Sequence, residues 1–217
     1  MIADNLKDII KELPRETKLV AVSKFHPSEL VMEAYDAGQR VFGESRPQEL
    51  AAKAEALPKD IEWHFIGHLQ TNKLKLVLPY AAMVQSVDTE HLLLEIDRWG
   101  RENSKVVDVL LEMHIGAEET KQGFVEEEVL DILFRASSFR NVRFRGLMGM
   151  ASHTDDEETV SADFERIDSF MAYLVDLFPE LECFDQLSIG MSDDWRIALR
   201  HGATMVRIGT AIFGARQ

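Results

Sequence analysis

Short apolar segments alternate along this chain with longer segments in which apolar residues recur three and four positions apart. The short segments are rich in β-branched and aromatic residues and have the length of strands rather than helices. Eight of them follow one another, at 19–22, 40–42, 62–66, 83–87, 106–113, 144–148, 184–188 and 205–208. We expect each of these segments to be a β-strand.

The longer segments carry the spacing and the end signals of amphipathic helices. Serine or threonine precedes several of them, and glycine or proline follows, as is typical of residues that begin and end helices. We expect helices from Ser28 to Gly38, from Thr89 to Gly100, over 163–178 before Pro179, and from Ser192 to Gly202. The segments 2–12 and 155–158 are also predicted to be helical, the second because its acidic residues suit a helix N-terminus.

Strands that alternate with helices predict a parallel sheet, because each connection must return the chain to the same end of the sheet. Eight such units close a (β/α)8 TIM barrel, and 217 residues fit its small end as one domain, 1–217. An open doubly wound sheet is the alternative, but its first strand is usually followed by a glycine-rich turn, whereas this chain has none at 23–27. Only 210–217 follow the eighth strand, so we expect the helix at 2–12 to cover the flank of an eighth helix.

The charge of the chain excludes one class of partner. Lys and Arg number 24 and Asp and Glu 38, so the formal net charge is −14. An acidic surface repels phosphodiester backbones, and we expect no nucleic-acid partner. No apolar run reaches the ~18 residues of a membrane span, the N-terminus lacks a signal-peptide pattern, and Cys183 is the only cysteine. We therefore expect a cytoplasmic protein without membrane contact.

Lys24 follows the first predicted strand, and the functional face of a parallel barrel lies at this end of its strands. A lysine in the mouth of a barrel is partly removed from water. Such burial lowers the pKa of its ammonium group and frees the amine to attack an aldehyde. The alternative is a lysine at the rim, with its ammonium group in water.

One glycine-containing segment follows the seventh strand and another ends the eighth, and the loops after these strands are where this fold usually binds phosphate. They are Gly190-Met191-Ser192 and Arg207-Ile208-Gly209-Thr210. Ser192 is a candidate helix N-cap and hydrogen-bond donor, and the glycines expose backbone N–H groups. Barrel closure places the eighth strand beside the first, so Arg207 and Gly209 become neighbours of Lys24. An amine, an arginine and a phosphate cup at one pole suit a small phosphorylated aldehyde.

Further candidates lie at the ends of the second and fifth strands. Ser45 with Gln48 has the form of a capping box, and Pro47 falls in the first turn of the helix it would begin. Glu44 and Glu112 are carboxylates that an isomerase acting on sugar phosphates would need, but that function leaves the lysine and the arginine unexplained. The seven histidines show no ligand spacing, so we expect no metal site.

Seven blocks of the sequence carry a resemblance to a known family. They are Leu19-Val20-Ala21-Val22-Ser23-Lys24, Phe42-Gly43-Glu44, Gln48-Glu49, His64-Phe65-Ile66-Gly67-His68-Leu69-Gln70-Thr71-Asn72-Lys73, Lys121-Gln122-Gly123-Phe124, Ser188-Ile189-Gly190-Met191-Ser192 and Val206-Arg207-Ile208-Gly209-Thr210-Ala211-Ile212-Phe213-Gly214. In this order, and over almost the whole chain, they resemble the pyridoxal phosphate homeostasis protein family. The resemblance implies a single-domain barrel like the N-terminal domain of alanine racemase, with pyridoxal 5′-phosphate as cofactor.

The resemblance also assigns site residues. Lys24 would form the internal aldimine, and Arg207 would face the pyridine nitrogen, which leaves that nitrogen unprotonated and weakens the ring as an electron sink. The phosphate would be held by Ser192, Gly209 and Thr210, with backbone help near Met191. The chain departs from the family at Ser45, where asparagine is usual, and at Pro47, where valine is common. The shorter Ser45 is retained as a candidate cofactor contact.

Two functions are compatible with this resemblance. The first is a carrier or buffer in pyridoxal phosphate homeostasis, which holds the cofactor on its lysine without robust turnover and exchanges it with cofactor-dependent apo-enzymes. The second is an amino-acid racemase, which needs a second base on the opposite face of the substrate. In two-domain racemases that base is a tyrosine of a second domain, whereas Tyr35, Tyr80 and Tyr173 fall in or near predicted helices. We therefore expect a carrier, and a monomer.

Overall fold

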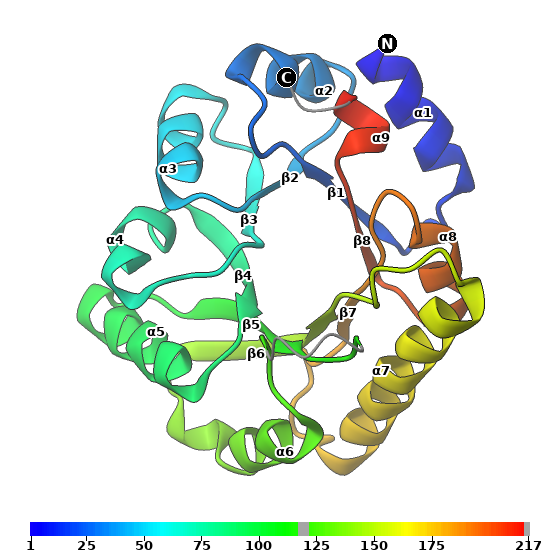
Figure 1. The fold of residues 1–217 in the computed structure, drawn as a ribbon. Helices are drawn as coiled ribbons and strands as arrows, with labels where there is room; N and C mark the ends of the chain where they lie inside the picture. Colours follow the sequence, from blue (N-terminus) through cyan, green and yellow to red (C-terminus); the bar gives the residue numbers. More distant parts are fainter. Residues whose placement is uncertain (117–121, 215–217) are drawn as a thin grey trace.

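Eight parallel strands form a closed barrel in the computed structural model, which describes residues 1–116 and 122–214. Neighbours in sequence are neighbours in the sheet, and β8 closes the barrel against β1 (Figure 1). The strands are β1 (Lys18–Val22), β2 (Val41–Glu44), β3 (Glu62–Phe65), β4 (Ala81–Val87), β5 (Val107–Met113), β6 (Val142–Gly149), β7 (Gln186–Ser188) and β8 (Met205–Ile208). The predicted TIM barrel is confirmed, and the open-sheet alternative is wrong.

Helices surround this barrel and connect its strands (Figure 1). The α-helices are α1 (Ile2–Glu12), α2 (Ser28–Asp36), α3 (Pro47–Ala56), α4 (Leu74–Val77), α5 (Glu90–Asn103), α6 (Glu126–Phe134), α7 (Glu157–Leu177), α8 (Trp195–Ala198) and α9 (Thr210–Phe213). Short 3-10 turns are η1 (Thr71–Lys73), η2 (Ala136–Ser138) and η3 (Leu199–His201).

Most predicted helix ends agree with the structure. Thr89 caps α5 by accepting a 3.2 Å hydrogen bond from the Leu92 amide. The acidic cluster begins α7, where the Asp156 side chain accepts from the Glu158 amide, and the same helix continues through the segment predicted at 163–178. Gly100 does not end α5. A Cβ there would lie 2.6 Å from the Lys105 carbonyl oxygen, so this glycine permits close packing inside the helix.

Two predicted N-caps are wrong. Arg46, not Ser45, is the N-cap of α3, because Pro47 occupies the first helical position and leaves Ser45 one residue too early to reach the helix amides. Asp194, not Ser192, is the N-cap of α8. Ser45 directly follows the end of β2, and Ser192 lies two residues before the N-cap of α8.

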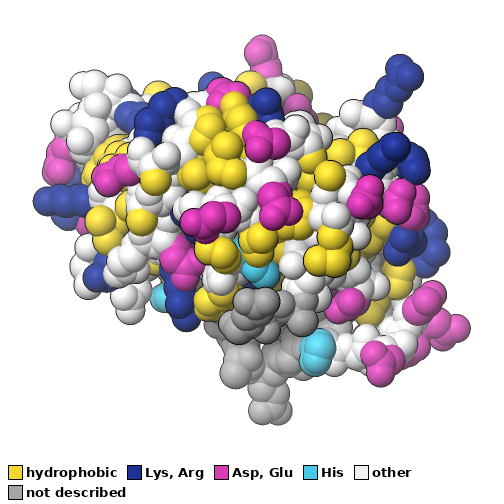
Figure 2. Space-filling view, turned by 90° about the horizontal axis from the view of Figure 1, so that it is seen from above, with side chains coloured by type: hydrophobic (Ala, Val, Ile, Leu, Met, Phe, Trp, Pro, Cys, Tyr) yellow, Lys and Arg dark blue, Asp and Glu magenta, His cyan; other side chains and the backbone are white. Residues whose placement is uncertain are grey.

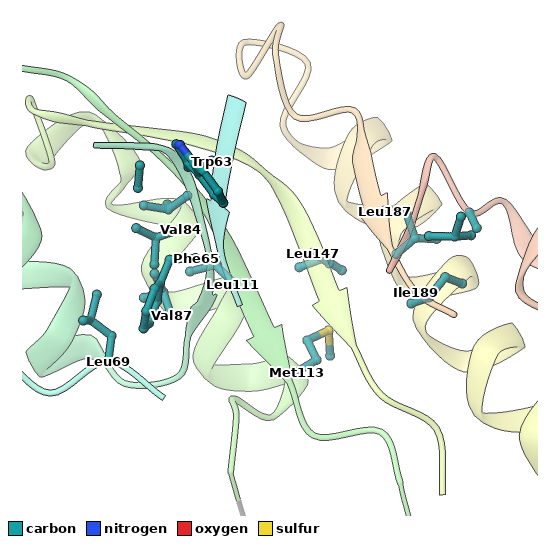
Figure 3. Close-up of a cluster of buried hydrophobic side chains, with 14 of the residues drawn as sticks. Trp63, Phe65, Leu69, Val84, Val87, Leu111, Met113, Leu147, Leu187 and Ile189 are labelled. Carbon is teal, nitrogen blue, oxygen red and sulfur yellow. The ribbon is translucent and has the colours of Figure 1, made fainter. Parts of the chain in front are cut away.

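Apolar side chains pack on both faces of the strands, in two layers. The larger lies between the barrel and its helices, and Figure 3 shows part of it around Trp63, Phe65 and Leu111. The smaller fills the barrel interior with Val20, Met83, Leu110, Met148 and Met205. Strands buried on both faces read as continuous apolar runs, which is why the eight segments were recognisable.

The N-terminal helix completes the outer ring beside the short α9 (Figure 1). The Asn5 side chain donates a 2.9 Å hydrogen bond to the Ile212 carbonyl oxygen, and Arg196 of α8 forms a bidentate ion pair with Glu12. Since α9 is a single turn, α1 covers the flank that a full eighth helix would cover, as predicted.

The outer surface mixes charges of both signs. On the face seen in Figure 2, acidic side chains are interspersed with basic and apolar ones. Within residues 1–116 and 122–214, the helices are too short or too polar to cross a bilayer.

Candidate functional site

Barrel closure brings the two ends of the chain together at the C-terminal end of the strands. β1 pairs with β8 in a register that sets Ala21 opposite Ile208. One residue further, a Cβ on Gly209 would lie only 3.1 Å from the Val22 carbonyl oxygen. Lys24, half-buried, follows two residues after Val22. The predicted proximity of these two segments is therefore present in the fold.

Ser192 links the loop after β7 to the start of α9. Its hydroxyl oxygen accepts hydrogen bonds from the Gly209 amide at 3.3 Å and from the Ala211 amide at 3.5 Å. Both bonds are long, so the two amides are only weakly engaged. A hydroxyl and two amides thus converge beside the end of β1, which is a set of groups able to bind an anion.

Met191 and Thr210 flank this set. The Met191 amide donates a 2.5 Å hydrogen bond to Asp194, so the backbone donor predicted here already has a partner. Burial raises the pKa of Asp194. Thr210 is exposed at the first position of α9. The roles predicted for Met191 and Thr210 stay predictions.

Arg207 points into the barrel and is 4% exposed. One guanidinium nitrogen donates to both the backbone oxygen and the hydroxyl of Ser188 at 2.7 Å, and the other donates to the Gly149 carbonyl oxygen at 2.9 Å. Burial lowers the pKa of Arg207 to about 10, which still leaves it charged at neutral pH. The guanidinium is therefore a cation held in a fixed orientation below the mouth of the barrel.

A chain of buried hydrogen bonds runs from Arg207 through the barrel interior. The Ser188 hydroxyl donates to Gln85 Oε1 at 2.7 Å, and Gln85 Nε2 donates to His64 Nδ1 at 2.6 Å. His64 Nε2 must then carry the ring proton, and it donates to Glu62 Oε1 at 2.8 Å. Burial lowers the pKa of His64, so this ring is neutral, and its hydrogen bond helps to lower the pKa of Glu62 to about 2.

Sequence reasoning did not identify this interior chain. The signal was present, because Gln85, His64 and Ser188 are polar residues within otherwise apolar strand segments. Their common inward direction depends on strand register, which only the folded barrel defines.

Glu112 and Glu44 are buried carboxylates at the ends of β5 and β2. Glu112 is 2% exposed, and its Oε2 has no hydrogen-bond partner in the described parts of the chain. Burial, and then the negative charge of Asp88, raise the pKa of Glu112 to about 7. Glu44 Oε1 accepts from Ser23 at 2.7 Å and from Lys53 at 2.6 Å, whereas its Oε2, like that of Glu112, has no hydrogen-bond partner among the described residues. Burial raises the pKa of Glu44 as well.

Ser45 lies beside the Lys24 turn. The β1–β2 register sets Val22 opposite Gly43, and Lys24 and Ser45 each come two residues after this pair, beyond the ends of the two adjacent strands. Gly67 packs directly on the Ser45 backbone, where a Cβ would overlap it. Lys121, the first residue of one block that carried the resemblance, lies outside the described residues.

The three tyrosines lie on the outside of the barrel. The hydroxyl of Tyr35 on α2 donates to Asp60, and the hydroxyl of Tyr80 donates to Glu55 at 2.6 Å. Tyr173 is exposed on α7. These positions do not supply a base opposite Lys24.

Comparison with known proteins places the chain among relatives of the same architecture. The sequence model of the family described as "Alanine racemase, N-terminal domain" matches residues 1–217. The pyridoxal phosphate homeostasis protein of Aquifex aeolicus is 39% identical over 206 residues, covering 92% of this chain and 87% of that protein. The Escherichia coli protein of the same name is 35% identical over 208 residues, covering 94% and 88%.

Solved structures agree with this placement. The structure of PipY from Synechococcus elongatus with pyridoxal phosphate bound superposes with a TM-score of 0.91 at 35% identity, covering 99% of this chain and 100% of that one. Alanine racemase from Bartonella henselae superposes with a TM-score of 0.74 at 14% identity, and this chain covers 58% of its length. The second similarity shows the fold alone.

Proposed function

The chain belongs to the pyridoxal phosphate homeostasis protein family, and we propose from this premise that it binds pyridoxal 5′-phosphate at the C-terminal end of its barrel. The proposed role is that of a carrier or buffer in the homeostasis of this cofactor. The finer parts of the proposal are a covalent link to Lys24 and the absence of robust turnover.

The observation that carries the proposal is the group of donors beside the end of β1. A phosphate monoester needs several hydrogen-bond donors, and Ser192 with the Gly209 and Ala211 amides provides three. The hydrogen bonds among these groups are long and therefore weak, so little free energy is lost when they are replaced by stronger hydrogen bonds to a phosphate. Glycine at 209 lets this segment lie close to the end of β1, because a Cβ there would lie 3.1 Å from the Val22 carbonyl oxygen.

Lys24 follows the same strand end and would react with the aldehyde of the cofactor. Lys24 would hold the cofactor through a Schiff base, in which its nitrogen would replace the aldehyde oxygen and that oxygen would leave as water. The charged Arg207 below the mouth would meet the ring nitrogen and keep it unprotonated. A ring in that state stabilises carbanions poorly, which favours storage over racemisation.

The positions of the tyrosines support the same conclusion. Racemisation needs a second acid or base opposite the lysine. Tyr35 and Tyr80 are hydrogen-bonded to outer carboxylates, away from the strand ends. Exchange of the cofactor with apo-enzymes, action as a monomer and residence in the cytoplasm complete the proposal.

Absorbance spectroscopy with borohydride trapping tests the covalent link. Purified protein mixed with the cofactor should show a visible Schiff-base band that borohydride removes, and peptide mass spectrometry should find the reduced label on Lys24. Lys24→Ala should lose the band, whereas Lys7→Ala, a change of an exposed lysine on α1, should keep it. An unchanged covalent band in Lys24→Ala would refute the assignment. Incubation with L-amino acids tests the carrier role, and D-isomer formation well above a free-cofactor control would overturn it.

A further inference from the structure

A buried ion-pair cluster holds the peptide on both sides of Lys24. It consists of Glu44 at the end of β2 and of Glu49 and Lys53 on α3. We infer that these are positioning residues. They keep the Lys24 amine where it can reach the aldehyde of a cofactor whose phosphate is bound by Ser192 and the Gly209 and Ala211 amides. The inference rests on the proposed function and goes beyond it, because none of the three residues needs to touch the cofactor.

The first half of the cluster fixes residue 23. Lys53 Nζ donates a 2.9 Å hydrogen bond to the Ser23 carbonyl oxygen and a 2.6 Å bond to Glu44 Oε1. The Ser23 hydroxyl donates to the same Glu44 oxygen at 2.7 Å. Ser23 and Glu44 are fully buried, and Lys53 is 6% exposed. Residue 23 is therefore bound through both its backbone and its side chain.

The second half fixes residue 25. The Phe25 amide donates a 3.0 Å hydrogen bond to Glu49 Oε2, and Lys53 Nζ lies 3.7 Å from the same oxygen. Phe25 has φ of +67°, a left-handed conformation that is unfavourable for a residue with a Cβ. The Arg46 guanidinium lies over the Phe25 ring at 4.2 Å, and Arg46 also pairs with Glu49 at 3.3 Å. Such a turn persists only where its surroundings hold it in place.

Lys24 lies between these two attachment points. A left-handed residue directly after it reverses the chain at the end of β1, and the direction of the Lys24 side chain depends on that reversal. Buried ion pairs are weak sources of stability, because desolvation offsets most of their attraction. A cluster that contacts both neighbours of one lysine is better explained by control of geometry than by stability.

Comparison of two ligands distinguishes a positioning role of the cluster from a general contribution to the structure of the site. Pyridoxal 5′-phosphate has the aldehyde, whereas pyridoxamine 5′-phosphate has the same ring and phosphate but cannot form the Schiff base. Loss of positioning weakens binding of the aldehyde alone. General damage to the site weakens binding of both ligands.

Glu49→Ala is the main variant, because the Glu49 side chain is one quarter exposed and its loss should be tolerated by the fold. We expect its affinity for pyridoxal 5′-phosphate and its rate of borohydride-trapped capture at Lys24 to fall about tenfold, with pyridoxamine 5′-phosphate affinity unchanged within about twofold. Glu49→Gln retains an oxygen acceptor for the Phe25 amide and should restore most of the loss. Glu33→Ala, which removes an exposed carboxylate on α2, is the control.

A second variant tests the buried half of the cluster. The double change Glu44→Gln with Lys53→Met replaces the ion pair with neutral groups of similar size, and should show the same selective loss of aldehyde binding. Equal losses for both ligands, or no loss for either, would overturn the inference. If wild-type protein captures the aldehyde on Lys24 and Glu49→Ala does so equally well, only the positioning inference fails. If wild-type protein does not capture it, the proposed function fails and the inference falls with it.

Discussion

Glu112 provides a direct test of the electrostatics inside the barrel. Its carboxyl group is buried at the end of β5, with one oxygen unpartnered among the described residues. Burial and the charge of Asp88 raise its pKa from 4.5 to about 7, although the positive charge of Arg207 acts in the opposite direction. The perturbation is Glu112→Gln, which keeps the shape of the side chain and removes its charge.

The pH dependence of the effect follows from proton linkage. Below pH 4.5 the carboxyl group is protonated in both the folded and the unfolded chain, so its titration does not affect folding. Between pH 4.5 and about 7 the unfolded chain has released the proton and the folded chain retains it, so the free energy of unfolding falls as pH rises. Above pH 7 the group is ionised in both states, and the free energy of unfolding has fallen by about 3 kcal/mol for a pKa raised from 4.5 to about 7.

The assay is urea unfolding of cofactor-free wild type and Glu112→Gln at several pH values from 4.5 to 8. The variant should gain about 3 kcal/mol relative to wild type between the two ends of this range. Any constant cost of the new amide group cancels in that comparison, as do titrations of distant groups. A difference between the two proteins that stays constant with pH, or that changes in favour of wild type as pH rises, would refute the reasoning.

Three further predictions test other parts of the structure. Gly146 has φ of +140°, and a Cβ there would overlap the Gln186 carbonyl oxygen, so Gly146→Ala should lower the free energy of unfolding by more than about 3 kcal/mol. The control is Gly38→Ala, at a position with φ of +102° and open space around it, which should lower the free energy of unfolding by only about 1 kcal/mol. Gln85→Leu interrupts the interior chain and leaves His64 Nδ1 without its donor, so urea unfolding should show a loss of about 2–3 kcal/mol, and an unchanged midpoint would argue against the chain. Ser192→Ala should weaken pyridoxamine 5′-phosphate binding about tenfold in a calorimetric titration. It should change the free energy of unfolding by less than about 1 kcal/mol, because the hydrogen bonds from the Gly209 and Ala211 amides to Ser192 are long. Equal affinity of the variant and wild type for this ligand would exclude Ser192 from the phosphate site.

The order of the strands and helices, and the meeting of the two ends of the chain, follow from the pattern of residues alone. Parallel strands buried on both faces leave apolar runs, and Thr89 and Asp156 mark helix starts through local hydrogen bonds. Eight such units imply closure, and closure implies that Lys24 and Gly209 follow the ends of adjacent strands. These are local or topological properties, which a one-dimensional pattern can express.

The inward direction of the polar side chains, and the groups that they bind, depend on how the strands pair in the folded barrel. The ladders shift register between Val84 and Val87 on β4 and between Val109 and Leu110 on β5, and each shift breaks the simple alternation of inward and outward residues. The partners of Arg207 and the burial of Glu112 depend on contacts between strands far apart in sequence. The failed cap at Ser192 has the same origin, because its hydroxyl accepts a hydrogen bond from Gly209 after β8 and Asp194 is the N-cap of α8. The failed cap at Ser45 is instead a local effect of Pro47.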